Sequence, residues 1–109
     1  MSTNAVIRVA GFKTGELYKH WDGYPDSTLP WLEKFNKDFA AQRGDDAPYK
    51  FAQLIRSSAF DGKDFHLDEA RYTGWGVFPS GSSHYDYLYI LNVDGTVKVV
   101  EDEDVERVD

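Results

Sequence analysis

His20 and Asp22 stand two residues apart in the stretch LYKHWDGYP, residues 17–25, and their side chains are of the types used in acid–base chemistry. Alternate side chains of a strand project from one face, so on a strand these two groups would lie together. Such a pair can act as a general base with its orienting carboxylate, or as two ligands of a metal ion. No third ligand is specified, because His66 and His84 fall in predicted loops, so we predict no metal site and no cofactor.

A hairpin is expected to bring Arg8 to the same place. Residues 5–12 and 17–21 favour two strands, and the sequence between them places Gly15 where a three-residue loop needs a left-handed residue. With that loop, opposed residue numbers sum to 28, and Arg8 lies opposite His20. A shift of one residue in this register would move the whole set to the other face of the sheet.

The same stretch also has an architectural interpretation. Asp22 and Gly23 suit a turn, Pro25 stops the strand, and Trp21 and Tyr24 can wedge a helix against the sheet. Tryptophan and tyrosine are equally the side chains that anchor protein interfaces. The residues alone leave both interpretations open.

Two helices are predicted after this stretch. The first covers residues 26–44, with Asp26, Ser27 or Thr28 as cap and Gly44 as terminator, and the second covers residues 46–60. Residues 61–71 are polar and mixed, which favours a loop that contains a helical turn. The apolar stripes expected to face the core are Leu32, Phe35, Phe39, Phe51, Leu54, Ile55 and Ser58.

Three further strands complete the pattern. Residues 72–79 predict a strand with a bulge or a close backbone approach near Trp75, because Gly74 and Gly76 flank it. The stretch PSGSSH, residues 79–84, lacks the lysine and the following helix of a phosphate loop and is interpreted as a flexible connector. Residues 85–100 predict a hairpin across NVDG with apolar side chains on both faces. The expected faces are Tyr85, Tyr87, Tyr89, Leu91, Val97 and Val99 on one side, and Leu88, Ile90 and Val100 on the other.

The element order predicts an α+β class, with an antiparallel sheet packed against two helices in the order ββααβββ. The 109 residues and 41% apolar content fit a single domain, residues 1–100, followed by an acidic tail, residues 101–109. The chain has no cysteine, which excludes a disulfide framework and a thiol nucleophile.

Charge excludes one class of partner. Of the net charge of −7, the tail contributes −5 from six acids and one arginine, so residues 1–100 carry only −2. A phosphate backbone rewards a broad positive field, so we expect no direct nucleic-acid partner. The apolar run at residues 5–10 contains Arg8 and is too short to span a bilayer, so we expect a cytoplasmic protein without a membrane partner.

The layout resembles a family of small bacterial and phage proteins that carry a Tyr-x-His-x-Asp-Gly-Tyr-Pro signature. Tyr18, His20, Asp22, Gly23, Tyr24 and Pro25 match that signature, and the order of the later elements matches over residues 5–100. The resemblance implies a cytoplasmic protein, associated with phages or mobile elements, in an accessory or anti-defence binding role. It implies no mechanism.

The leading hypothesis is a non-catalytic interaction domain that binds a protein through aromatic side chains around Trp21, Tyr24 and Trp75, with a homo-oligomer as one option. Its basis is the 16% aromatic content and the absence of a complete catalytic set. The alternatives are a small-ligand site for a nucleotide-like molecule, or a weak hydrolase with His20 as base and Asp22 orienting it. The ligand site would comprise Arg8, Tyr18, His20 and Asp22. Arg56, on the second helix, is interpreted as a solvated or ion-paired side chain.

Overall fold

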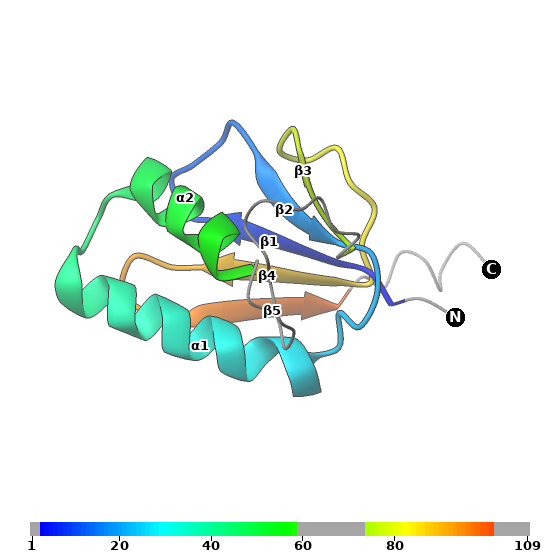
Figure 1. Ribbon diagram of the computed structural model, residues 1–109, viewed down its shortest axis with the longest axis horizontal. Coiled ribbons are helices and arrows are strands. Elements are labelled where there is room, and N and C mark those ends of the chain that lie inside the picture. Colours follow the sequence, from blue (N-terminus) through cyan, green and yellow to red (C-terminus); the bar gives the residue numbers. More distant parts are fainter. Residues whose placement is uncertain (1–2, 59–73, 102–109) are drawn as a thin grey trace, which may run out of the picture.

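Five strands and two helices follow one another in the predicted order. A computed structural model describes residues 3–58 and 74–101 (Figure 1). The elements are β1 Ala5–Val9, β2 Glu16–Lys19, α1 Pro25–Gln42, α2 Ala47–Ser58, β3 Trp75–Phe78, β4 Tyr87–Leu91 and β5 Val97–Glu101. This confirms the α+β class and the ββααβββ order. The predicted loop at residues 61–71 and most of the predicted tail, residues 102–109, lie outside the described residues.

The strands form one sheet in the order β3-β2-β1-β4-β5. Three of its four neighbouring pairs are antiparallel as predicted, but the central strand β1 pairs with β4 in parallel. The chain reaches β4 from the edge strand β3 through residues 79–86, so β4 starts at the same end of the sheet as β1. Neither local propensity nor periodicity carries a signal for this crossing, since both describe only the elements themselves.

Both helices pack on the face of the sheet formed by odd-numbered strand residues (Figure 1). In α1 and α2 the predicted stripes supply the covering side chains, although Ile55 is 38% exposed and lies outside the core. Among the described helices, none is long and apolar enough to cross a membrane. The buried cluster consists of Ala5, Ile7, Val9, Leu17, Leu32, Ala47, Phe51, Leu54, Tyr89 and Leu91.

The opposite face, formed by even-numbered residues, is also partly covered. Val6 of β1 and Leu88 of β4 are buried there, whereas Val99 of the edge strand β5 is 37% exposed, so β4 is covered on both sides and β5 is not. The connection at residues 79–86 runs along this face, because backbone N–H groups of Gly81 and Ser83 donate to the carboxylate of Glu16 at 2.8 and 3.2 Å.

The predicted register of the first hairpin is wrong. Ala5 pairs with Lys19 and Ile7 with Leu17, so opposed residue numbers sum to 24 rather than 28. Arg8 therefore lies opposite Glu16 instead of His20. The cause is a longer connection: β1 ends at Val9, and the chain turns first at Gly11, whose φ is +90°, before β2 begins at Glu16. The registers differ by an even number of residues, so the side chains within β1 and β2 keep their predicted faces, whereas Asp22 lies beyond the end of β2.

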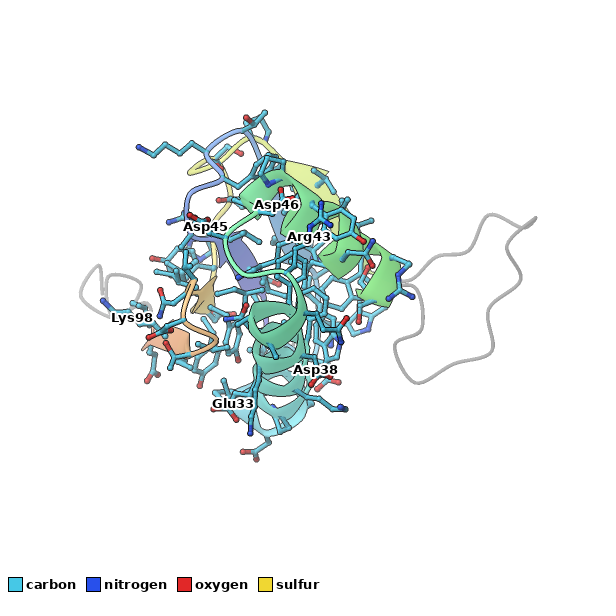
Figure 2. The ribbon with its side chains drawn as sticks, turned by 90° about the vertical axis from the view of Figure 1, so that its left-hand side faces the viewer. Glu33, Asp38, Arg43, Asp45, Asp46 and Lys98 are labelled. Carbon is cyan, nitrogen blue, oxygen red and sulfur yellow. The ribbon has the colours of Figure 1, made fainter. Side chains whose placement is uncertain are left out.

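The second hairpin and the C-terminal end of α1 agree with expectation, but the predicted cap is wrong, because α1 begins at Pro25 with Tyr24 as its N-cap. Tyr89 pairs with Val99, and Gly95 of the NVDG turn has a φ of +98°. Gly44, with a φ of +76°, follows the end of α1. At the connection between the helices, Arg43 and Asp46 lie side by side and form an ion pair at 3.2 Å (Figure 2).

Candidate functional site

The stretch LYKHWDGYP joins β2 to α1, and its buried members connect three parts of the fold. Gly23 donates its N–H to the Thr3 carbonyl at 2.9 Å, and its own carbonyl accepts the Tyr89 hydroxyl at 2.7 Å. A Cβ at Gly23 would lie 2.7 Å from the Cβ of Ala5. Only glycine fits this close approach, so Gly23 has an architectural role.

Asp22 supports the start of α1. Its φ of +60° places it in the left-handed region, which aspartate tolerates better than most residues. The Ser27 hydroxyl donates to its carboxylate at 3.1 Å, and the Thr28 hydroxyl donates to its carbonyl at 3.3 Å. The residue at the helix N-cap, Tyr24, forms no side-chain cap hydrogen bond. Ser27 and Thr28, predicted as caps, therefore tie the first turn of α1 back to Asp22.

His20 is exposed, and its Nδ1 lies 3.0 Å from the Tyr18 hydroxyl. Within residues 3–58 and 74–101, no hydrogen bond or ion pair joins His20 to Asp22. The base and its orienting carboxylate are therefore not brought together, and the hydrolase hypothesis receives no geometric support. The same ranges contain no group of three or more histidine, aspartate or glutamate side chains that could hold a metal. His84 lies in a loop, and His66 is outside the described residues.

Arg8 has a different partner from the predicted one. Its Nε donates to Glu16 Oε1 at 2.8 Å, and the Glu16 side chain is fully buried. Burial alone would raise the pKa of Glu16, but hydrogen bonds from the Gly81 N–H, Arg8 and the Ser83 N–H outweigh it and lower the pKa. The backbone N–H groups of the loop at residues 79–84 thus bind a carboxylate of the same chain rather than a phosphate. Because Glu16 is 65 residues before Gly81, no local pattern reveals this contact.

The three aromatic side chains of the leading hypothesis have separate packing partners. The Trp75 ring meets Trp31 edge to face at 5.6 Å on the helix side of the sheet. Trp21 packs on Gly74, where a Cβ would come within 2.9 Å of its ring. Tyr24 is 53% exposed, with its ring 6.0 Å from that of Tyr87.

A chain of ring contacts instead links four side chains, which we call the aromatic ridge: Phe78, Tyr18, His20 and Trp21. The successive ring centroids are 5.4, 6.0 and 6.0 Å apart. Phe78 is 43% exposed and His20 is exposed, so the ridge is accessible from solvent. Phe78 was missed in the sequence, although its place two residues after Gly76 puts it on the same face as Tyr18.

The ridge borders β3, which is an edge strand. Among the described residues β3 pairs only with β2, and none of its four residues is charged. The His20 N–H donates to the Gly74 carbonyl at 2.8 Å. Because hydrogen-bonding direction alternates along an antiparallel pair, the backbone groups of Trp75 and Val77 point away from β2. We call this outward side the β3 edge.

Comparison with known proteins adds no constraint: no protein-family model, curated protein or solved structure matches the chain.

Proposed function

We propose that the protein is a non-catalytic binding domain that takes an extended segment of a partner protein along the β3 edge. In this mode the partner adds a strand to the sheet, and backbone hydrogen bonds supply much of the affinity. The observation that carries the proposal is an uncharged edge strand on which Val77 is 53% exposed and Phe78 is 43% exposed.

The contrast between the two edges of the sheet supports this choice. Proteins protect an exposed edge against unwanted pairing with charged side chains, and lysine above all. The other edge strand, β5, carries Lys98 and Glu101. The β3 edge has no such charge, so it is suited to pairing with another strand.

The aromatic ridge supplies the side-chain contacts of the proposed complex. Phe78 lies at its start on β3, and Trp21 lies at its end beyond β2. Aromatic side chains with polar groups are enriched at the centres of interfaces, and this ridge also offers the imidazole of His20. The expected partner segment is a strand with apolar residues at alternate positions. The side chains on one of its faces pack on the ridge.

Two proline variants test the proposal. The N–H of Val77 points outward from β3, and by the same alternation, set by the Asn92 N–H to Thr96 carbonyl bond, the N–H of Val99 points outward from β5. Proline is tolerated at such edge positions, so Val77→Pro and Val99→Pro should both fold. Only the first removes a donor from the proposed interface.

The assay begins with a random peptide library selected on the wild-type protein, followed by calorimetric titration of the enriched peptides. We expect alternating apolar sequences whose Kd rises about tenfold or more in Val77→Pro, because a hydrogen bond is lost and the ring obstructs pairing. Val99→Pro should bind as the wild type does. Failure to enrich any peptide, or equal effects of the two variants, would contradict the proposal. Dimerisation abolished by Val77→Pro would instead assign the edge to a second copy of the chain.

The accessory or anti-defence role implied by the family resemblance stays a prediction. Identification of a natural partner by its competition with the selected peptides would test it.

A further inference from the structure

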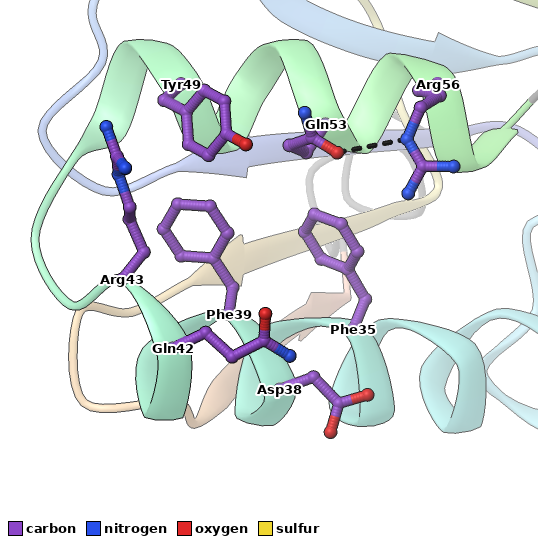
Figure 3. A pocket seen from close by; sticks show the side chains of 8 residues that line it. All are labelled: Phe35, Asp38, Phe39, Gln42, Arg43, Tyr49, Gln53 and Arg56. Carbon is purple, nitrogen blue, oxygen red and sulfur yellow. Dashed lines mark hydrogen bonds between the residues drawn. The ribbon is translucent and has the colours of Figure 1, made fainter.

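A groove of about 400 Å³ lies between α1 and α2 and opens away from the sheet (Figure 3). Its apolar surface is formed by Phe35, Phe39 and Tyr49. The ring centroids of Phe35 and Phe39 are 6.4 Å apart, and those of Phe39 and Tyr49 are 5.8 Å apart. Phe39 is 8% exposed and forms the floor, whereas Tyr49 is 43% exposed and forms an accessible wall. A cavity of this volume accommodates a small organic molecule.

Arg56 contributes the charge that such a molecule would meet. Arg8 pairs with Glu16 and Arg43 pairs with Asp46, whereas Arg56 has no carboxylate partner within residues 3–58 and 74–101. Its Nε donates to the side-chain oxygen of Gln53 at 3.0 Å (Figure 3). This bond fixes the plane of the guanidinium and leaves both Nη groups as a fork, the geometry that binds a carboxylate with two parallel hydrogen bonds.

The remaining walls disfavour a second negative charge on the α1 side of the ligand. The Arg43 guanidinium lies 4.5 Å from the centre of the Tyr49 ring and is held by Asp46, so it closes one end of the groove. Asp38, on the α1 side, accepts a hydrogen bond from Lys34 at 3.0 Å. A second anionic group of the ligand, directed toward α1, would approach the Asp38 carboxylate and be repelled.

From this arrangement we infer that the α1–α2 groove is a binding site for a flat aromatic monocarboxylate. The aromatic body stacks between Phe35 and Tyr49 above Phe39, and the carboxylate accepts two hydrogen bonds from the Nη groups of Arg56. The site suits both parts of the ligand. Aromatic rings favour offset or edge contacts with other rings, and a guanidinium group favours a carboxylate. The inference is independent of the β3 edge, since α1 and α2 supply every contact.

The test uses three naphthalene probes and records amide NMR spectra of the full chain during titration. The probes are 2-naphthoate, its neutral counterpart 2-naphthamide, and the dianion 2,6-naphthalenedicarboxylate. We expect saturable shifts at residues that line the groove with 2-naphthoate, and affinity about tenfold or more weaker with the amide. The dianion should also bind more weakly than 2-naphthoate because of Asp38.

Two substitutions with the same charge change separate a specific contact from general electrostatics. Arg56→Gln should weaken 2-naphthoate binding about tenfold or more while leaving the affinity for 2-naphthamide nearly unchanged. Lys98→Gln is the control, because Lys98 lies on the opposite side of the molecule from Arg43 and Asp38 (Figure 2), and it should change neither affinity. Both residues are exposed, so both variants should fold.

Three results would overturn the inference. The first is the absence of saturable shifts with 2-naphthoate at millimolar concentration. The second is equal affinity for the acid and the amide, which would remove the role of Arg56. The third is a set of shifts that lies outside the groove. A groove that responds to an amphipathic helical peptide and not to 2-naphthoate would likewise overturn the inference and assign the groove to a protein partner.

Discussion

The substitution Glu16→Gln measures how strongly the buried carboxylate anchors the connection between β3 and β4. Glu16 Oε1 accepts from Arg8 Nε and from the Gly81 N–H, both at 2.8 Å, and Oε2 accepts from the Ser83 N–H at 3.2 Å. A glutamine keeps one acceptor oxygen but places an NH₂ group against the Ser83 N–H. The Ser83 N–H is then left without its acceptor. The bonds from Arg8 and the Gly81 N–H now end on a neutral oxygen instead of a charged one.

The magnitude follows from these three bonds. An unsatisfied buried N–H costs about 1–3 kcal/mol, and a hydrogen bond to a charged group exceeds a neutral one by about 1 kcal/mol. Relief from burying a charge offsets part of this loss. We expect Glu16→Gln to lower the free energy of unfolding by about 2–4 kcal/mol at pH 7, equivalent to a decrease in Tm of roughly 10 °C.

The pH dependence gives an independent check. The folded-state pKa of Glu16 lies below its ordinary value of 4.5, because the hydrogen bonds outweigh burial. A depressed carboxylate pKa contributes stability that is fully present above the unfolded-state pKa and is lost as the pH falls through the folded-state value. The difference between wild type and Glu16→Gln should therefore be constant near neutral pH and shrink below a pH of about 4.5.

Denaturant unfolding at several pH values between 7 and 3 measures this difference. Glu33→Gln is the matched control, because Glu33 is an exposed residue of α1 with no ion pair among those described, and its effect should stay within about 0.5 kcal/mol. A Glu16→Gln effect as small as that of the control would refute the anchoring role. So would a difference that persists unchanged at pH 3, because below the unfolded-state pKa the unfolded chain binds a proton at Glu16 that the folded carboxylate resists.

Three further substitutions test the packing around this fold, each by denaturant unfolding. Gly23→Ala should cost more than about 2 kcal/mol, because its Cβ would lie 2.7 Å from the Ala5 Cβ; a neutral result would mean that the junction can shift. Asn36→Ala should cost about 3 kcal/mol or more, because the Asn36 oxygen accepts from the buried ammonium of Lys50 at 2.7 Å; tolerance would show that the ammonium finds water. Tyr89→Phe should cost about 1–2 kcal/mol through its lost bond to the Gly23 carbonyl, and a stabilising result would contradict it.

Local signals predicted the parts of the fold that local interactions determine. The NVDG turn and the alternation around it fixed the β4–β5 register, since Gly95 needs its positive φ and Tyr89 must face the core. Helical periodicity likewise placed Leu32 and Leu54 in the core. The parallel pairing of β1 with β4 had no such signal, because it depends on how the chain crosses the sheet.

The burial of polar residues could not be predicted from the sequence for a related reason. Lys50 is 2% exposed, and its amine donates to Asn36 and to the Asn92 carbonyl. Burial lowers its pKa, although Asp45 and Asp94 act in the opposite direction. A lysine on an amphipathic helix is ordinarily solvated, so only the meeting of α1, α2 and the β4–β5 turn makes this one internal. The roles of Phe78 and Glu16 in the candidate site could not be predicted for the same reason, since both depend on partners that are distant in sequence.

The density of reactive residue types in LYKHWDGYP has a structural explanation. Gly23 and Asp22 hold together the end of β2, the N-terminal segment and the first turn of α1, and such a junction needs tight turns and polar contacts. The exposed imidazole of His20 belongs to the aromatic ridge at the β3 edge, whereas Arg56 belongs to a groove on the helices. Because these surfaces share no residue, the effects of Val77→Pro and Arg56→Gln on their respective ligands should be independent, and coupling between them would require a conformational change that links the sheet edge to the helix pair.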